Sequence, residues 1–370
     1  MAEAGAPLRV TLLTEGDPGQ LTGGYLYQQR MAAAAPAQKC ALNFVSLPPR
    51  SFLLSLAAGQ QSLRRLPPSD AIVVDSIVAA SLARSVGQLV ADLPLVALVH
   101  QQPGGVEGKP MLRYIRRRLD LLTYRRASAV IATSHFLEGL LTTSRVAAAR
   151  IAVVPPGRDP VGADQPRALP NLRHGRQAAL LCVSNWTRNK SIELALEAVA
   201  HLKPEIATLH LVGRTDVDPA YSKRLRLRLA ADDLRERVVV HGSQPPAAIP
   251  SLLQAADILV HPSRHEAYGA AVAEAMAAGV PVVGFRIDNL PYLVREGADG
   301  ILVPFGDIPA MAAALALLIR DQDRREAMGA SARMRAMGWP TWAETAEAFF
   351  SFIRQVVDQP NARSPDRRAG

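Results

Sequence analysis

Two glutamates between Ser263 and Val283 are spaced so that both could face one ligand. Glu266 stands in a polar loop, and Glu274 follows within a segment of small residues that we expect to be helical. The backbone N–H groups at the start of a helix are unpaired and lie at the positive end of its dipole, which suits a phosphate or a sugar hydroxyl. The Glu274 carboxylate could accept two ribose hydroxyls. The first turn consists of small residues that let a ligand approach the backbone: Gly269, Ala270 and Ala271.

The elements around these glutamates alternate between strand and helix along most of the chain. Short runs rich in β-branched residues are typical of buried parallel strands, and the longer segments between them predict helices. The predicted strands are Leu8–Leu13, Ala71–Val74, Leu95–His100, Val130–Ala132, Ile151–Val154, Ala178–Val183, Leu209–Val212, Val238–His241, Ala256–Val260 and Val280–Phe285. The predicted helices are Tyr25–Ala35, Ser191–Leu202, Tyr221–Asp233, Ala270–Ala278 and Pro309–Ile319.

A break in this pattern divides the chain into two α/β domains. Residues 1–157 form the first, and residues 158–177, rich in Pro, Gly and Arg, are predicted to be a linker. The second domain, residues 178–335, repeats the strand-helix order, so we expect two doubly wound parallel sheets. In that architecture ligands bind beyond the carboxyl ends of the strands, and the cleft between the domains is the expected site.

The composition excludes several other classes of protein. The chain has 370 residues, of which 49% are hydrophobic, too many for a disordered chain. Its apolar runs are shorter than a membrane span, and the N-terminus does not have the pattern of a signal peptide. Cys40 and Cys182 are too few for a disulfide framework or a zinc site, so we expect a cytoplasmic protein.

The Ser263–Val283 stretch closely resembles the donor site of retaining GT-B glycosyltransferases, in particular glycosyltransferase family 4. Glu266 and Glu274 meet the family's signature of two glutamates separated by seven residues. The surrounding Ser-x-x-Glu-x-Tyr-Gly, Glu-Ala-Met-Ala and Gly-x-Pro-Val-Val also follow the family pattern. Further motifs occur in the family's order: Leu211-Val212-Gly213, Val240-His241-Gly242, Ala255-Ala256-Asp257 and Gly297–Val303.

This resemblance implies a GT-B fold, in which two Rossmann-like domains face each other across a cleft. Residues 1–157 would be the acceptor domain and residues 178–335 the nucleotide-sugar donor domain. Residues 336–357 resemble the family's final helix, which crosses back to the first domain. The polar residues 358–370 are expected to be a disordered tail.

The resemblance also implies which side chains meet the donor. Lys190 matches the family lysine that binds the diphosphate, and Glu266 is the first signature glutamate. The family's arginine is replaced by Asn185, which makes Arg188 the candidate for the guanidinium. The donor-binding residues implied in the second domain are Asn185, His241, Gly242, Tyr268, Gly269, Ala270, Ala271 and Glu274.

Three residues of the first domain complete the implied site. Gly23 and Gly24 resemble the family's glycine pair after the first strand, where a backbone without side chains can approach a diphosphate. His100 ends a predicted strand and matches the histidine that lies beside the transferred sugar. A plain glycine turn and a buried core histidine are the structural alternatives for these positions.

The implied reaction moves a hexose-type sugar from a UDP- or GDP-sugar to an acceptor hydroxyl with retained configuration, without a metal or other cofactor. The acceptor is unknown, and a lipid-linked molecule or a small glycoside would suit the family. One alternative is a nucleotide-sugar-binding protein with a degenerate site, because Asn185 departs from the family pattern. Another is a nucleotide-sugar 2-epimerase, a class that shares the fold but lacks the two-glutamate signature.

A net charge of +9 indicates anionic partners, and one segment concentrates it. Leu112–Arg126 holds six arginines and one aspartate, with apolar residues at helical spacing. It is predicted to be either a helix that contacts anionic membrane at the inner face or an ordinary surface helix. Nucleic acid is not an expected partner, because no aromatic residues interleave a basic platform.

Overall fold

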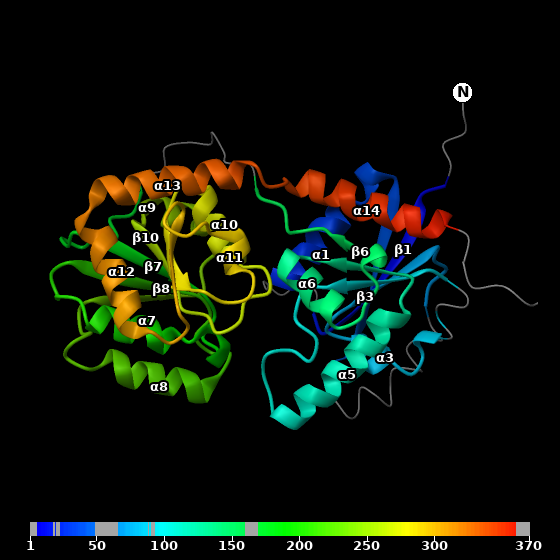
Figure 1. Ribbon diagram of the computed structural model, residues 1–370, viewed down its shortest axis with the longest axis horizontal. Helices are drawn as coiled ribbons and strands as arrows, with labels where there is room; N and C mark the ends of the chain where they lie inside the picture. Colours follow the sequence, from blue (N-terminus) through cyan, green and yellow to red (C-terminus); the bar gives the residue numbers. More distant parts are fainter. Residues whose placement is uncertain are drawn as a thin grey trace, which may run out of the picture. The chain divides into compact units, whose positions relative to one another are not determined.

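Contacts within the chain divide it into two units, which are described separately (Figure 1). The computed structural model describes residues 6–17, 19, 23–48, 66–87, 89, 93–159 and 169–359. Unit 1 comprises Met1–Gly157 and Pro340–Gly370, and unit 2 comprises Arg158–Trp339. Most of the predicted linker, 160–168, and the predicted tail from residue 360 onward lie outside the described residues.

The sheet of unit 1 has six parallel strands in the order β2-β1-β3-β4-β5-β6. The strands are β1 (Leu8–Glu15), β2 (Cys40–Leu47), β3 (Ala71–Asp75), β4 (Leu95–Val99), β5 (Ala129–Ala132) and β6 (Ile151–Val153). The helices include α1 (Gly23–Ala34), α3 (Ala79–Leu82), α5 (Pro110–Arg126), α6 (His135–Thr143) and α14 (Trp342–Asp358). The strand order reverses between β1 and β3.

The sheet of unit 2 is also parallel, in the order β12-β11-β10-β7-β8-β9. The strands are β7 (Ala178–Val183), β8 (Ala207–Val212), β9 (Val238–Gly242), β10 (Ile258–His261), β11 (Val282–Phe285) and β12 (Gly300–Val303). The helices are α7 (Ile192–Ala200), α8 (Pro219–Leu229), α9 (Ile249–Ala255), α10 (Ala270–Ala277), α11 (Leu290–Leu293), α12 (Ile308–Arg320) and α13 (Gln322–Met337). This strand order is that of a Rossmann fold, and it reverses between β7 and β10.

Apolar side chains cover both faces of the unit 2 sheet, as a doubly wound architecture requires. In unit 1, α14 closes one face: its Phe349 and Phe350 are fully buried and pack with Tyr27 and Met31 of α1. A capping box formed by Thr341 and Glu344 fixes where α14 begins. The predicted α/β class with two doubly wound sheets is confirmed.

The sequence pattern missed several elements and joined two helices into one. The unpredicted strands and helices are β2, β12, α3, α6, α9, α11 and α13. Strand β2 has only partly buried residues after Cys40, which weakens its apolar signal. The segment 336–357 is not one helix, because α13 continues to Met337 and a turn precedes α14. Among the described residues, no helix is both long and apolar enough to span a membrane.

Candidate active site

The loops that follow β7 and β10 meet where the unit 2 sheet reverses its strand order. Lys190 lies in the short helix after β7, and its Nζ is 2.6 Å from Oε2 of Glu266 in the loop after β10. The side chains are 26% and 15% exposed, so the pair is largely shielded but still reaches solvent. An ammonium has three donors, so this contact leaves Lys190 with N–H groups for an anionic ligand.

A third side chain, a histidine that was not predicted from the sequence, lies beside this pair. His261 is the last residue of β10, is buried, and places Nε2 3.2 Å from the same Glu266 oxygen. Burial alone would raise the pKa of the Glu266 carboxyl, but the Lys190 ammonium and His261 outweigh it and lower the pKa far below its usual range. The sequence did contain a signal for His261, because this residue directly follows a predicted strand and α/β proteins bind ligands at the carboxyl ends of their strands.

The Glu266 loop is held by polar groups that follow β11. Asp288 accepts the Glu266 N–H at 3.0 Å and lies 3.2 Å from His265 Nδ1. Asn289 donates its own N–H to the Glu266 carbonyl and its side-chain amide to the Tyr268 carbonyl, at 3.2 and 2.7 Å. These contacts fix the backbone from which the Glu266 side chain extends. They were not predicted, because they depend on where two separate loops meet.

Gly269 begins the helix whose N-terminus was expected to face the ligand. Its φ is +102°, and a Cβ there would lie 3.0 Å from Leu293 and 3.5 Å from Glu266, so glycine permits this turn. No side chain caps α10, which leaves the N–H groups of Ala270 and Ala271 for a ligand. Glu274 is exposed on α10.

Arg188 and Asn185 do not contact Glu266 as Lys190 does; each is bound to another partner. The Arg188 Nε is 3.1 Å from Asp218, and its side chain is 62% exposed. Asn185 accepts the backbone N–H of Arg214 through its side-chain oxygen at 2.9 Å. Asn185 therefore holds the loop after β8. For Arg188 to take the role of the family arginine, as predicted, the Arg188 guanidinium must leave Asp218.

The imidazole of His241 is hydrogen-bonded to that of a second histidine, His210. Its Nε2 is 2.8 Å from Nδ1 of His210, whose Nε2 is 2.7 Å from the Leu172 carbonyl. Because a carbonyl can only accept, His210 carries its proton on Nε2, and His241 must donate from its own Nε2. Burial, with the neighbouring His241, lowers the pKa of His210 to about 4. Burial also lowers the pKa of His241.

In unit 1 the predicted residues follow the carboxyl ends of β1 and β4. A Cβ on Gly24 would lie 2.6 Å from Nε2 of His100, so glycine is needed here for the approach of an imidazole. The same nitrogen is 3.3 Å from Asp75, a fully buried carboxylate that the sequence analysis did not select. A carboxylate neighbour favours the proton on Nε2, which leaves the buried Nδ1, unpartnered in the structure, as an acceptor. Gly23 has no atom within 4 Å of the Cβ position.

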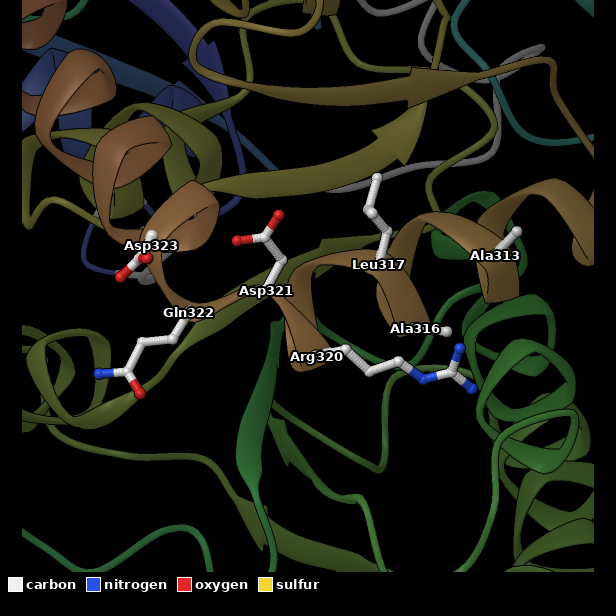
Figure 2. Close-up of a pocket in the computed structure, with 7 residues that line it drawn as sticks. All are labelled: Ala313, Ala316, Leu317, Arg320, Asp321, Gln322 and Asp323. Carbon is white, nitrogen blue, oxygen red and sulfur yellow. The ribbon is translucent and has the colours of Figure 1, made fainter.

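A separate hollow of about 650 Å³ lies along the end of α12 and the start of α13 (Figure 2). Helix α12 follows β12 and runs back toward the amino ends of the strands. Arg325, just inside α13, is 3.6 Å from Asp257, which directly precedes β10. The hollow thus lies at the sheet edge opposite Glu266. In the described part of the chain, no group of three or more His, Cys, Asp or Glu side chains is arranged to hold a metal ion.

Two family models match nearly the whole chain. Residues 1–157 match the model described as a glycosyl transferase 4-like domain, and residues 168–335 match glycosyl transferases group 1. A D-inositol 3-phosphate glycosyltransferase from Corynebacterium urealyticum is 32% identical over 231 residues, 59% of this chain and 54% of that protein. The chain therefore spans about half the length of this relative.

Solved structures show the same two-unit fold at low sequence identity. Sucrose-phosphate synthase from Thermosynechococcus elongatus has a TM-score of 0.76 and 22% identity, covering 94% of this chain and 99% of that chain. The Anabaena protein HepE, in complex with UDP and glucose, has a TM-score of 0.74 and 19% identity, covering 94% and 100%. Together with the family models, these likenesses identify the chain as a member of the glycosyltransferases of GT-B fold, of the family 4 type.

Proposed function

We propose that this glycosyltransferase binds a UDP- or GDP-sugar at the Lys190–Glu266 pair and transfers a hexose-type sugar with retained configuration. The observation that carries this proposal is the 2.6 Å contact between those side chains at the strand-order reversal of unit 2. Nucleotides bind at this position of a Rossmann sheet. The complex of HepE with UDP and glucose, a protein of the same fold, favours UDP as the first donor to test.

The charges of the donor have partners at this edge of the sheet. Lys190 and the free N–H groups of Ala270 and Ala271 would bind the diphosphate, and Glu274 would accept the ribose hydroxyls. As the bond between the anomeric carbon and the diphosphate breaks, Lys190 stabilises the charge on the leaving oxygen. The acceptor oxygen forms its bond on the same face and gives its proton to the leaving diphosphate. No covalent protein nucleophile and no metal enter this scheme.

His100 would contact the transferred sugar. In the structure its Nε2 faces Asp75 and its Nδ1 is buried, so the imidazole would have to turn outward to bind a sugar hydroxyl. The acceptor is proposed to be a lipid-linked molecule or a small glycoside. The first turns of α5 expose Met111, Leu112 and Tyr114 between arginines, which supports the proposal that a cytoplasmic enzyme contacts anionic membrane there.

A thermal-shift panel with UDP, GDP and ADP, each with and without glucose attached, tests the proposed donor. A ligand at about 100 times its Kd adds about 2.7 kcal/mol to the stability, which moves the melting temperature by several degrees. We expect one nucleotide to give this shift and Lys190→Met to abolish it. Lys203→Met is the matched control, because Lys203 is exposed and lies before β8, at the sheet edge opposite Lys190.

Turnover separates an active enzyme from a protein that only binds its nucleotide. The nucleotide-sugar that gives the shift is incubated with acceptor candidates, and the anomeric configuration of the product is read by NMR. A product with inverted configuration would contradict the retaining mechanism. A shift without transfer to any acceptor would favour the degenerate site that Asn185 suggests.

A further inference from the structure

Unit 1 carries a groove of about 410 Å³ between the second half of α5 and the end of α6, and arginines dominate its lining. Four guanidinium groups line it: Arg117, Arg118, Arg125 and Arg145. We refer to it as the arginine groove. All four residues are exposed. The only long apolar side chain in the lining is Leu121, which is buried, so the groove is not an apolar docking surface.

Across residues 93–159, none of these four arginines forms an ion pair with a carboxylate. Asp120 of α5 is buried and accepts the Gly104 N–H instead, and Glu138 of α6 pairs with His135. Several arginines of unit 2 are paired instead: Arg228, for example, lies between Glu197 and Asp233 at 2.6 and 2.7 Å. The arginine groove therefore concentrates four positive charges without local compensation, which attracts an anion of high charge.

Neutral groups hold Arg118 and Arg125 in place without cancelling their charge. Arg125 donates from Nε and NH2 to the Ser144 carbonyl at 3.2 and 2.7 Å. Arg118 lies 5.5 Å from the Tyr114 ring centroid and donates to its hydroxyl at 2.8 Å. Fixing the side chains in the free protein reduces the entropy that a ligand would have to remove on binding.

The position of Arg145 adds a second argument. It follows the C-cap of α6 with a φ of +64°, a left-handed conformation that glycine adopts without cost. A bulky residue there costs of order 1 kcal/mol. The chain places a guanidinium at this position, where it extends the charge of the groove.

We propose that the arginine groove binds the phosphate group of a phosphorylated ligand. Planar guanidinium forks match the oxygens of a phosphate, and several of them together favour a dianion or a diphosphate over a single carboxylate. The groove is separate from the residues near His100. Helix α5 starts after the carboxyl end of β4 and returns toward the amino edge of the sheet, where Ser128 pairs with Leu95. This inference does not rest on the proposed donor site.

Pyrophosphate is the first probe, measured by calorimetry and by amide hydrogen exchange at low salt. We expect it to protect the backbone of residues 139–146, and we expect the Arg118→Gln/Arg145→Gln variant to lose that protection and bind at least tenfold more weakly. The Arg113→Gln/Arg126→Gln variant removes the same charge from α5 outside the groove and should change affinity less than twofold. No protection of 139–146, or equal weakening in both variants, would overturn the proposal.

A second arm identifies the source of the phosphate. Vesicles of phosphatidylcholine with and without phosphatidic acid are sedimented with the protein. Binding that needs phosphatidic acid, is competed by pyrophosphate and is lost only in the groove variant assigns a lipid headgroup. Pyrophosphate binding without such vesicle binding assigns a soluble phosphorylated ligand. Vesicle binding that survives in the groove variant, with no pyrophosphate effect on 139–146, would contradict a phosphate site in the groove.

Discussion

Glu266 in unit 2 and Asp75 in unit 1 both lie beside the reversal of the strand order, but these two carboxylates have different neighbours. In unit 2, Glu266 meets the Lys190 ammonium and His261 and keeps some exposure to solvent. In unit 1, Asp75 is fully buried and accepts from neutral donors: the Thr14 hydroxyl, the Gln28 amide and the Ile77 N–H. Glu266 is therefore part of an ion pair, whereas Asp75 accepts hydrogen bonds from uncharged groups.

This difference separates two functions that the same architecture can support. The Lys190–Glu266 pair retains free donors and can accept a further anion without losing its own contact. Asp75 has its oxygens occupied, and its remaining neighbour is the imidazole of His100 at 3.3 Å. We infer that unit 2 uses its carboxylate to position a cation for a ligand, whereas unit 1 uses its carboxylate to orient a histidine.

Removing the cation of unit 2 should give the largest effect. Lys190→Met leaves the Glu266 charge shielded from water and without its main partner, which costs about 3 kcal/mol in unfolding free energy at pH 7. We also expect sugar transfer to fall at least about a hundredfold, because a charged donor contact is lost. Urea unfolding and a transfer assay measure the two effects.

A double variant shows whether that stability loss arises from the unpaired charge. Lys190→Met/Glu266→Gln should recover more than half of the stability, because a neutral amide costs less to bury than a carboxylate. It should not recover activity. If the double variant is as unstable as Lys190→Met alone, the ion pair does not explain the loss and the contrast with Asp75 weakens.

Lowering the pH should change the stability of the two units in opposite directions, because a buried group in each unit has its pKa shifted in the opposite sense. The pKa of His210 in unit 2 is lowered to about 4 by burial, so the unfolded chain binds the proton more readily and unit 2 loses up to about 3 kcal/mol as the pH falls from 6.5 to 4. The pKa of Asp120 in unit 1 is raised to about 6 by burial, so folded unit 1 takes up that proton and gains stability as the pH falls through 6.

Amide hydrogen exchange at pH 7 and pH 5, corrected for intrinsic rates, would measure this contrast. We expect β8 and β9 to lose protection at pH 5 and α5 to keep it. His210→Gln should remove much of the pH dependence of β8 and β9, and His241, whose pKa is also lowered by burial, should account for part of the rest. Equal losses in both units would show that these two groups do not control the response to acid.

Neutralising the carboxylate of unit 1 should have an intermediate effect. Asp75→Asn puts a donor amide among groups that already donate, so at least one buried hydrogen bond is lost, at a cost of about 2 kcal/mol. It also removes the partner that favours the Nε2–H form of His100. Urea unfolding measures the first effect, and the ¹⁵N shifts of the His100 ring measure the second. An unchanged tautomer would show that Asp75 does not orient His100.

Much of the fold could be predicted, because buried parallel strands are short apolar runs. Strand β2 and helix α13 could not, since β2 is only partly buried and α13 carries many charges. Two parts of the candidate site could be predicted: the Glu266 loop and the helix that holds Glu274. They were predicted from the spacing of the two glutamates and from the family resemblance. His261 ends the strand that leads into the Glu266 loop, but Asp75 and Asp288 come from other strands, and only the folded sheet shows which strand ends are neighbours.

The smallest effect, and the most selective one, should come from adding one methyl group in unit 1. An alanine Cβ at Gly24 would lie 2.6 Å from His100 Nε2, so the imidazole must move away from Asp75. Because alanine also favours the helix, we expect stability to change by less than about 1 kcal/mol. We expect kcat/KM to fall about tenfold, which corresponds to about 1.4 kcal/mol of transition-state stabilisation. Gly23→Ala, with nothing within 4 Å, is the matched control and should keep full activity. If both variants lose activity equally, the glycine pair acts through backbone access to the ligand rather than through the approach of His100.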